Sequence, residues 1–167
     1  MDETEWEARV ETAWESFDEL DETEFLALIE KLAAERPAGD GAGFFERASS
    51  LDATDHPDVA IPLYEQALTA GLPGGRRRQA VIQLASSLRL AGRSRESVDL
   101  LTAELDATSD QLNDAVIAFL ALALTDIGRE REAVSVALAA LAPHLNRYQV
   151  SVSNYARQLV EPGGSPG

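Results

Sequence analysis

The chain carries, at residues 84–101, the stretch LASSLRLAGRSRESVDLL, which aligns without a gap on LALALTDIGREREAVSVA at residues 120–137. The two stretches lie 36 residues apart, and eight of their positions are identical, including Gly92 with Gly128 and Glu96 with Glu132. Identity this dense, at both apolar and turn positions, is hard to produce by chance. We therefore interpret the two stretches as copies of one repeated unit.

A third, weaker copy lies upstream at an offset of 37 residues. The tetrapeptide ASSL at residues 48–51 recurs at residues 85–88, and apolar residues follow it at matching places. The turn differs, because DATDHP stands where the other copies have Gly-Arg. Repeats of this length predict helical hairpins that stack, since a single hairpin cannot bury its apolar face alone.

Each copy is predicted to hold two helices. Apolar residues recur at helical spacing in both halves of a copy, as at Val81, Leu84, Ala85, Leu88, Val98, Leu101 and Leu105. Gly92 and Gly128 supply the left-handed residue that ends the first helix, and Ser94 is expected to cap the second. Pro57 suits the first turn of a helix, where its missing N–H costs nothing. No long stretch has strand periodicity, so the predicted fold class is all-α.

The flanks predict further helices. Residues 1–36 form an acidic N-terminal helical hairpin that caps the stack, with a capping box at Asp21 and Glu24. The apolar faces of its two helices are Trp6, Val10, Ala13, Trp14 and Phe17, then Phe25, Leu28, Ile29 and Leu32. Residues 41–160 hold the repeats and a C-terminal capping helix, and residues 161–167 form a flexible tail. The apolar positions of the capping helix are Leu145, Tyr148, Val152, Tyr155, Ala156 and Leu159.

The composition excludes several classes of function. Of 167 residues, 29 are acidic and 14 basic, for a net charge of −15. A surface this negative repels phosphate backbones, so nucleic acid is not an expected partner. With no Cys and two His, the chain offers little for a metal site, and we expect no cofactor. The longest apolar run, residues 115–124, is shorter than the roughly 20 residues that span a bilayer, so we expect a cytoplasmic protein with no membrane partner.

We also expect no enzymatic activity. Catalysis needs groups that converge in a pocket, whereas His56 and His144 each lie at a junction between predicted helices. Sequence motifs for phosphate loops, zinc proteases, nucleophilic serines and calcium loops are absent. No residue is assigned a catalytic role.

The repeats resemble tetratricopeptide repeats. Small residues recur at fixed places, namely Ala48, Ala85 and Ala121 in the first helices and Ala60, Ser97 and Ala133 in the second. The order FFERASS, VAIPLYEQAL, RRRQAVIQLASSLRLAGRSRESV and AFLALALTDIGREREAV is also similar to a bacterial subfamily of short, stand-alone members. The resemblance implies a right-handed superhelix of about three hairpins, although the period exceeds the ~34 residues usual in the family.

The resemblance also implies a concave binding side, lined by first-helix residues. In this chain the candidates are Phe45, Ser49, Asp52, Ile82, Ser86, Arg89, Ala118, Leu122 and Thr125. Phe45, Ile82 and Leu122 are candidate anchors for a short amphipathic helix or extended peptide, and Arg89 for an acidic group. The set lacks the Lys and Asn ladder with which some members hold a C-terminal carboxylate, so that specificity is not implied. The alternative is that these side chains are ordinary filler between helices.

Two charged features allow more than one interpretation. Arg76, Arg77 and Arg78 form either an anion dock at a helix N-terminus or a solvated patch that pairs with nearby acids. Residues 1–36 hold 13 acidic and 3 basic side chains, which could steer a basic partner, fold against the chain's own Arg-rich turns, or simply confer solubility. The Trp pair in this hairpin belongs to a core or, if the hairpin does not pack, to a dimer seam.

The predicted function is a non-catalytic scaffold that binds a peptide or protein segment in the concave groove of the repeats. The alternative is a self-associating structural subunit, a homodimer formed through the N-terminal hairpin or an end helix.

Overall fold

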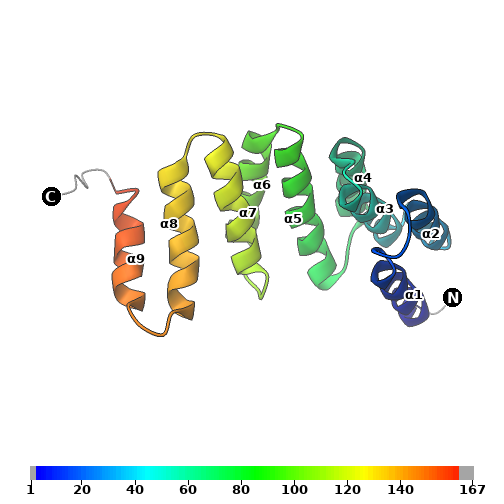
Figure 1. Ribbon diagram of the computed structural model, residues 1–167, viewed down its shortest axis with the longest axis horizontal. Coiled ribbons are helices and arrows are strands. Elements are labelled where there is room, and N and C mark those ends of the chain that lie inside the picture. Colours follow the sequence, from blue (N-terminus) through cyan, green and yellow to red (C-terminus); the bar gives the residue numbers. More distant parts are fainter. Residues whose placement is uncertain (1–2, 162–167) are drawn as a thin grey trace. The chain divides into compact units, whose positions relative to one another are not determined.

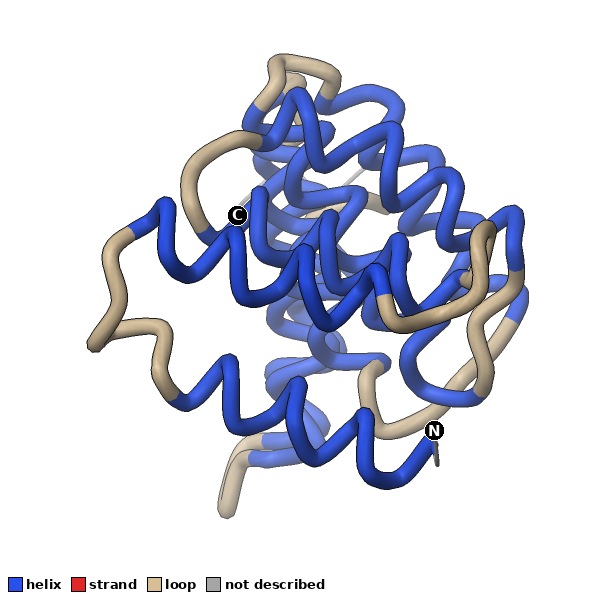
Figure 2. The backbone as a smooth tube through the Cα atoms, turned by 90° about the vertical axis from the view of Figure 1, so that its right-hand side faces the viewer, coloured by secondary structure: helices blue, strands red, loops and turns tan. Residues whose placement is uncertain are grey.

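The computed structural model describes residues 3–161, and within that range all the regular structure is helical (Figure 2). The elements are α1 Glu3–Glu15, α2 Glu22–Ala34, α3 Gly41–Ala53, α4 Pro57–Ala70, α5 Gly74–Leu90, α6 Ser94–Ala107, α7 Asn113–Asp126, α8 Glu130–Leu141, the 3₁₀ turn η1 Ala142–His144, and α9 Gln149–Gln158. The predicted all-α class is confirmed. None of these helices is both long and apolar enough to cross a lipid bilayer.

The chain forms two compact units that divide between Ser87 and Leu88, inside α5. The first unit holds α1 to α4 and most of α5, and the second holds the end of α5 followed by α6 to α9 (Figure 1). Successive helices pack against each other, α1 on α2 and α3 on α4 in the first unit, α6 on α7, α7 on α8 and α8 on α9 in the second. The predicted division into residues 1–36, 41–160 and 161–167 remains a prediction, and all but Glu161 of the tail lies outside the described residues.

The N-terminal hairpin packs through the apolar faces that its periodicity predicts. Trp6, with 1% of its surface exposed, and Phe25 are fully buried members of a core cluster that also takes in Ala42 of α3. The indole N–H of Trp6 donates a hydrogen bond of 2.8 Å to the carbonyl oxygen of Leu32, which fixes α1 to the end of α2. The predicted capping box is present at the start of α2, where Asp21 and Glu24 bond each other's backbone N–H. The hairpin thus shares its core with the first repeat.

A glycine contact sets the distance between α3 and α4. A Cβ atom added to Gly41 would lie 2.3 Å from the carbonyl oxygen of Gly71 and 3.0 Å from that of Ala67. Both obstacles are backbone atoms, so they cannot rotate away. The start of α3 therefore approaches the end of α4 more closely than any side chain permits.

The two repeated Gly-Arg turns adopt the predicted conformation. Gly92 and Gly128 have φ of 78° and 77°, and the next N–H in each turn donates back to the preceding helix, as from Arg93 to Leu88 at 2.8 Å. The capping role expected for Ser94 was wrong. Arg93 holds the N-cap position without a side-chain cap, since a guanidinium has no acceptor for a helix N–H, and the Ser94 hydroxyl lies inside the helix and donates to Asp126 at 3.3 Å.

The last helix is shorter than predicted. It begins after Tyr148, which has a left-handed φ of 69° and an exposed ring. Of the predicted apolar positions Ala156 is buried, and Ser135 of α8 donates a hydrogen bond of 2.7 Å to its carbonyl. Tyr155 is exposed. The two Tyr side chains therefore lie outside the packed face to which the pattern assigned them.

Candidate functional site: a groove in the first unit

Side chains from α1, α3 and α5 surround an open groove of about 910 Å³ in the first unit. Its lining is Thr4, Glu7, Ala8, Val10, Glu11, Trp14, Phe45, Glu46, Ser49, Arg76, Gln79 and Gln83. Each of the three helices is the first of its hairpin, and the family resemblance assigns the binding surface to first helices. The N-terminal hairpin contributes a wall of this groove as well as a core.

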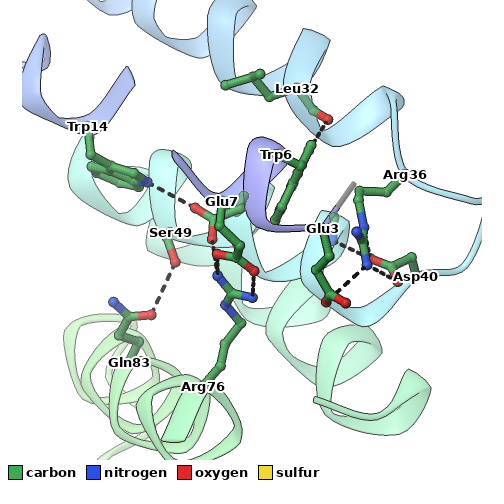
Figure 3. A network of polar contacts seen from close by, with 12 residues as sticks. Glu3, Trp6, Glu7, Trp14, Leu32, Arg36, Asp40, Ser49, Arg76 and Gln83 are labelled. Carbon is green, nitrogen blue, oxygen red and sulfur yellow. Dashed lines mark hydrogen bonds and ion pairs between the residues drawn. The ribbon is translucent and has the colours of Figure 1, made fainter. Parts of the chain in front are cut away.

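An ion pair spans the groove from α1 to α5 (Figure 3). Arg76 donates two hydrogen bonds to Glu7, from Nη1 to Oε1 at 2.6 Å and from Nη2 to Oε2. This two-pronged geometry is the strong form of a guanidinium–carboxylate contact. The hydrogen bonds from Arg76 hold the pKa of Glu7 below its usual value, and the same contact raises the pKa of Arg76. The contact bears out the idea that the acidic hairpin folds against an Arg-rich turn.

Glu46 is a buried carboxylate in the same lining. It is 3% exposed, and its Oε2 accepts a hydrogen bond of 2.9 Å from the indole N–H of Trp14. Its Oε1 lies 3.7 Å from Nη2 of Arg76, which is beyond hydrogen-bond distance. Burial raises the pKa of Glu46, and the bond from Trp14 and the charge of Arg76 offset part of that rise.

Polar contacts between α3 and α5 hold two walls of the groove together. Ser49 donates to Oε1 of Gln83 at 3.1 Å (Figure 3), and the hydroxyl of Tyr64 on α4 donates to Ser49 at 3.4 Å. One turn further along, Ser87 donates to Asp52 at 2.8 Å. Burial raises the pKa of the Asp52 carboxyl, and the bond from Ser87 partly offsets it.

The predicted groove residues of the first unit divide into two sets. Phe45 and Ser49 line the groove. Asp52 bonds Ser87 instead, Ile82 is buried, and Ser86 is half-buried. On α3, two of the three candidate residues therefore lie in the lining. On α5 the lining residues are Arg76, Gln79 and Gln83, and neither Ile82 nor Ser86 is among them.

The remaining predicted groove residues belong to the second unit. Arg89, at the end of α5, forms an ion pair of 3.1 Å with Asp126 of α7, so its own chain supplies the acidic group expected from a ligand. Ala118, Leu122 and Thr125 lie on one face of α7, three to four residues apart, and all three are exposed.

The three successive arginines do not share a face. Arg76 pairs with Glu7 in the groove, Arg77 is exposed, and Arg78 is 2% exposed. Within residues 3–161, no group of three or more His, Cys, Asp or Glu side chains is placed to hold a metal ion.

The candidates predicted from the sequence did not include the lining residues of α1, because α1 lies outside the repeats, and the predicted α5 face was about one residue out of register. At 3.6 residues per turn, the step from Ile82 to Gln83 rotates the face by about 100°. The spacing of Arg76, Gln79 and Gln83, three and four residues apart, was a usable signal for one polar face. A second signal was Glu46, an acid that directly follows the apolar pair Phe44 and Phe45.

Comparisons with known proteins agree with this architecture. A family model described as Tetratrico peptide repeat matches residues 41–159. The chain belongs to the tetratricopeptide repeat family. Proteins with these repeats generally serve as protein-interaction scaffolds and are generally not catalysts. A search of curated proteins gave no match.

Two solved structures share the fold. Both are of a Podosopora anserina protein assigned as a kinesin light chain, with nearly identical TPR-like repeats. One of them, a form with a single substitution, has a TM-score of 0.72 at 20% identity, over 96% of this chain and 85% of that one. The other has a TM-score of 0.71 at 21% identity, over 93% of this chain and 83% of that one. A match of this extent includes most of the N-terminal hairpin.

Proposed function

We propose that this tetratricopeptide repeat protein is a non-catalytic scaffold that binds a peptide or protein segment in the groove between α1, α3 and α5. The observation that carries the proposal is the groove itself, about 910 Å³ lined by the first helices of three successive hairpins. Its lining combines exposed polar side chains such as Gln79 with the half-buried ring of Trp14 and the buried ring of Phe45. Amide groups pair with a peptide backbone, and aromatic faces hold apolar side chains, so the lining suits an extended segment.

The proposal is tested by filling the groove from an exposed position. Gln79→Trp places a large ring in the groove without disturbing a buried residue, because Gln79 is exposed. Gln66→Trp makes the same change on an exposed position of α4, away from the groove lining. Affinity capture from native lysate should recover partners with wild type and Gln66→Trp but lose them with Gln79→Trp. Equal recovery by all three proteins would refute the groove as the binding site.

The exposed face of α7 remains a proposed contact of the second unit. Leu122→Asp changes a side chain that is 48% exposed, so folding should be unaffected. Weaker capture of the same partners by Leu122→Asp would support a contact there, and unchanged capture would remove Ala118, Leu122 and Thr125 from the proposal.

Self-association is a second candidate, favoured by the exposed apolar side chains at the C-terminal end. Tyr148, Val150 and Tyr155 all expose most of their surface, and an exposed apolar face is typical of contact sites. The N-terminal hairpin offers less, because the cluster around Trp6 already buries its apolar faces. Sedimentation velocity between about 1 and 100 µM should show a dimer that Tyr155→Lys dissociates. A monomer at every concentration would end this candidate.

A further inference from the structure

The groove lining has an excess of negative charge. It contains the carboxylates of Glu7, Glu11 and Glu46 but one guanidinium, that of Arg76. Because Glu7 holds Arg76 through two hydrogen bonds, their charges offset each other and the other two carboxylates remain. The surroundings add to this field, since residues 1–87 carry 19 acidic and 7 basic side chains. A cation approaching the first unit is therefore attracted from a distance.

Within this lining, Glu46 has an incomplete set of partners. A carboxylate offers about four acceptor sites, and within residues 3–161 the polar contacts of Glu46 are one hydrogen bond from Trp14 and the Arg76 guanidinium at 3.7 Å. A charged group that is 97% buried is costly unless it is well paired. A donor that brings a positive charge into the groove would complete its coordination.

The aromatic side chains of the groove can contact both the methylene groups and the charged group of a Lys or Arg side chain. The rings of Trp14 and Phe45 line the same groove as Glu46. Cations stack on aromatic faces, and the methylene stems of Lys and Arg pack on apolar surface. The Arg76 guanidinium lies 5.7 Å from the centre of the Phe45 ring, a cation–aromatic contact within the chain itself, and the half-buried ring of Trp14 is the more accessible of the two rings.

An acidic ligand fits less well. Its carboxylate would have to displace Glu7 from Arg76, which would leave Glu7 unpaired beside Glu11 and Glu46. Like charges in one site repel, and the repulsion is strongest where water is excluded.

We infer that the segment bound in this groove is basic, an inference that rests on the proposed function. A Lys or Arg side chain of the segment contacts Glu46, and Glu11 adds electrostatic attraction at the exposed edge of the groove.

Selection from a display library of random 12-residue peptides tests the inference on the full-length protein. Wild type should enrich peptides with an excess of Lys and Arg. The best peptide, made synthetically, should bind Glu46→Gln at least tenfold more weakly than wild type, whereas Glu65→Gln, an exposed charge on α4, should bind within twofold of wild type. Glu11→Gln should weaken binding about threefold, and replacing the enriched Lys or Arg of the peptide by Met should abolish it.

The outcomes separate this inference from the proposed function. If the selection enriches neutral or acidic peptides, and Gln79→Trp abolishes their binding, the groove remains a binding site but its preference for cations is overturned. Basic peptides that bind Glu46→Gln as tightly as wild type would overturn the role of Glu46. If the enriched peptides bind Gln79→Trp as tightly as wild type, both proposals are refuted. If Glu46→Gln does not fold, the charge of the enriched peptides and the Glu11→Gln measurement decide the question.

Discussion

At the scale of single residues, the positions that matter most are those where one atom sets the distance between helices. Gly41 is such a position, because the carbonyl oxygens of Ala67 and Gly71 occupy the space of a side chain. Gly75, near the start of α5, is the opposite case, since no atom lies within 4 Å of its added Cβ. Helix propensity alone favours Ala over Gly at both sites by roughly 0.5–1 kcal/mol.

We predict that Gly41→Ala lowers the free energy of unfolding by about 2 kcal/mol, because α3 and α4 must separate to admit the methyl group. Gly75→Ala should leave it unchanged or raise it by up to about 1 kcal/mol. Urea denaturation followed by circular dichroism measures both variants. Two variants of equal stability would show that the close approach does not exist.

Trp6 is the residue on which the packing of α1 depends. Trp6→Phe removes the hydrogen bond to Leu32 and leaves a buried carbonyl without that donor. We expect a loss of about 1–3 kcal/mol in the free energy of unfolding. Val59→Ala, at an exposed position of α4, serves as the control and should change it by less than about 0.5 kcal/mol. A free energy of unfolding that Trp6→Phe leaves unchanged would show that α1 does not depend on this ring for its packing.

At the scale of elements, polar contacts join helices of the first unit that are not adjacent in the sequence. The pair of Glu7 and Arg76 joins α1 to α5, and Ser49 with Gln83 joins α3 to α5. Helix boundaries and turns could be predicted because Gly92, Gly128 and Asp21 act through their own backbone neighbours. These inter-helix contacts could not, because residues 69 apart in the chain, such as Glu7 and Arg76, meet only through tertiary packing.

The Glu7–Arg76 pair should give the protein an acid-sensitive contribution to stability. The pKa of Glu7 is lowered in the folded protein, so the contribution is fully present above the unfolded value of roughly 4.3 and is lost as the pH falls through the lower folded value. We expect Glu7→Gln to cost about 1 kcal/mol or less at pH 7, since the carboxylate is partly exposed. Urea denaturation at a series of pH values checks this.

The matched control is Glu15→Gln, which removes the same charge from an exposed position of the same helix. The difference between wild type and Glu7→Gln should shrink between pH 5 and pH 3, whereas Glu15→Gln should follow wild type throughout. A difference for Glu7→Gln that is independent of pH would contradict the pairing.

At the scale of the whole molecule, repetition made the family predictable and the binding surface only partly so. The Gly-Arg turns and small residues recur from copy to copy, and the family model matches the span that they occupy. The groove departs from the repeats, because α1 has no counterpart in the repeated sequence and yet lines one wall. On α3, the candidates Phe45 and Ser49 lie in the lining of the groove, but on α5 a rotation of about one residue places Gln79 and Gln83 there in place of Ile82 and Ser86.

The central claim, that the groove between α1, α3 and α5 holds a segment of another protein, is tested most directly by photo-cross-linking in living cells. A benzoylphenylalanine at Gln79 reports on the groove, and one at Gln66 reports on the exposed surface of α4. Mass spectrometry of the adducts should find one partner segment joined to position 79 and absent from position 66. Partner adducts at position 66 with none at position 79 would contradict the account.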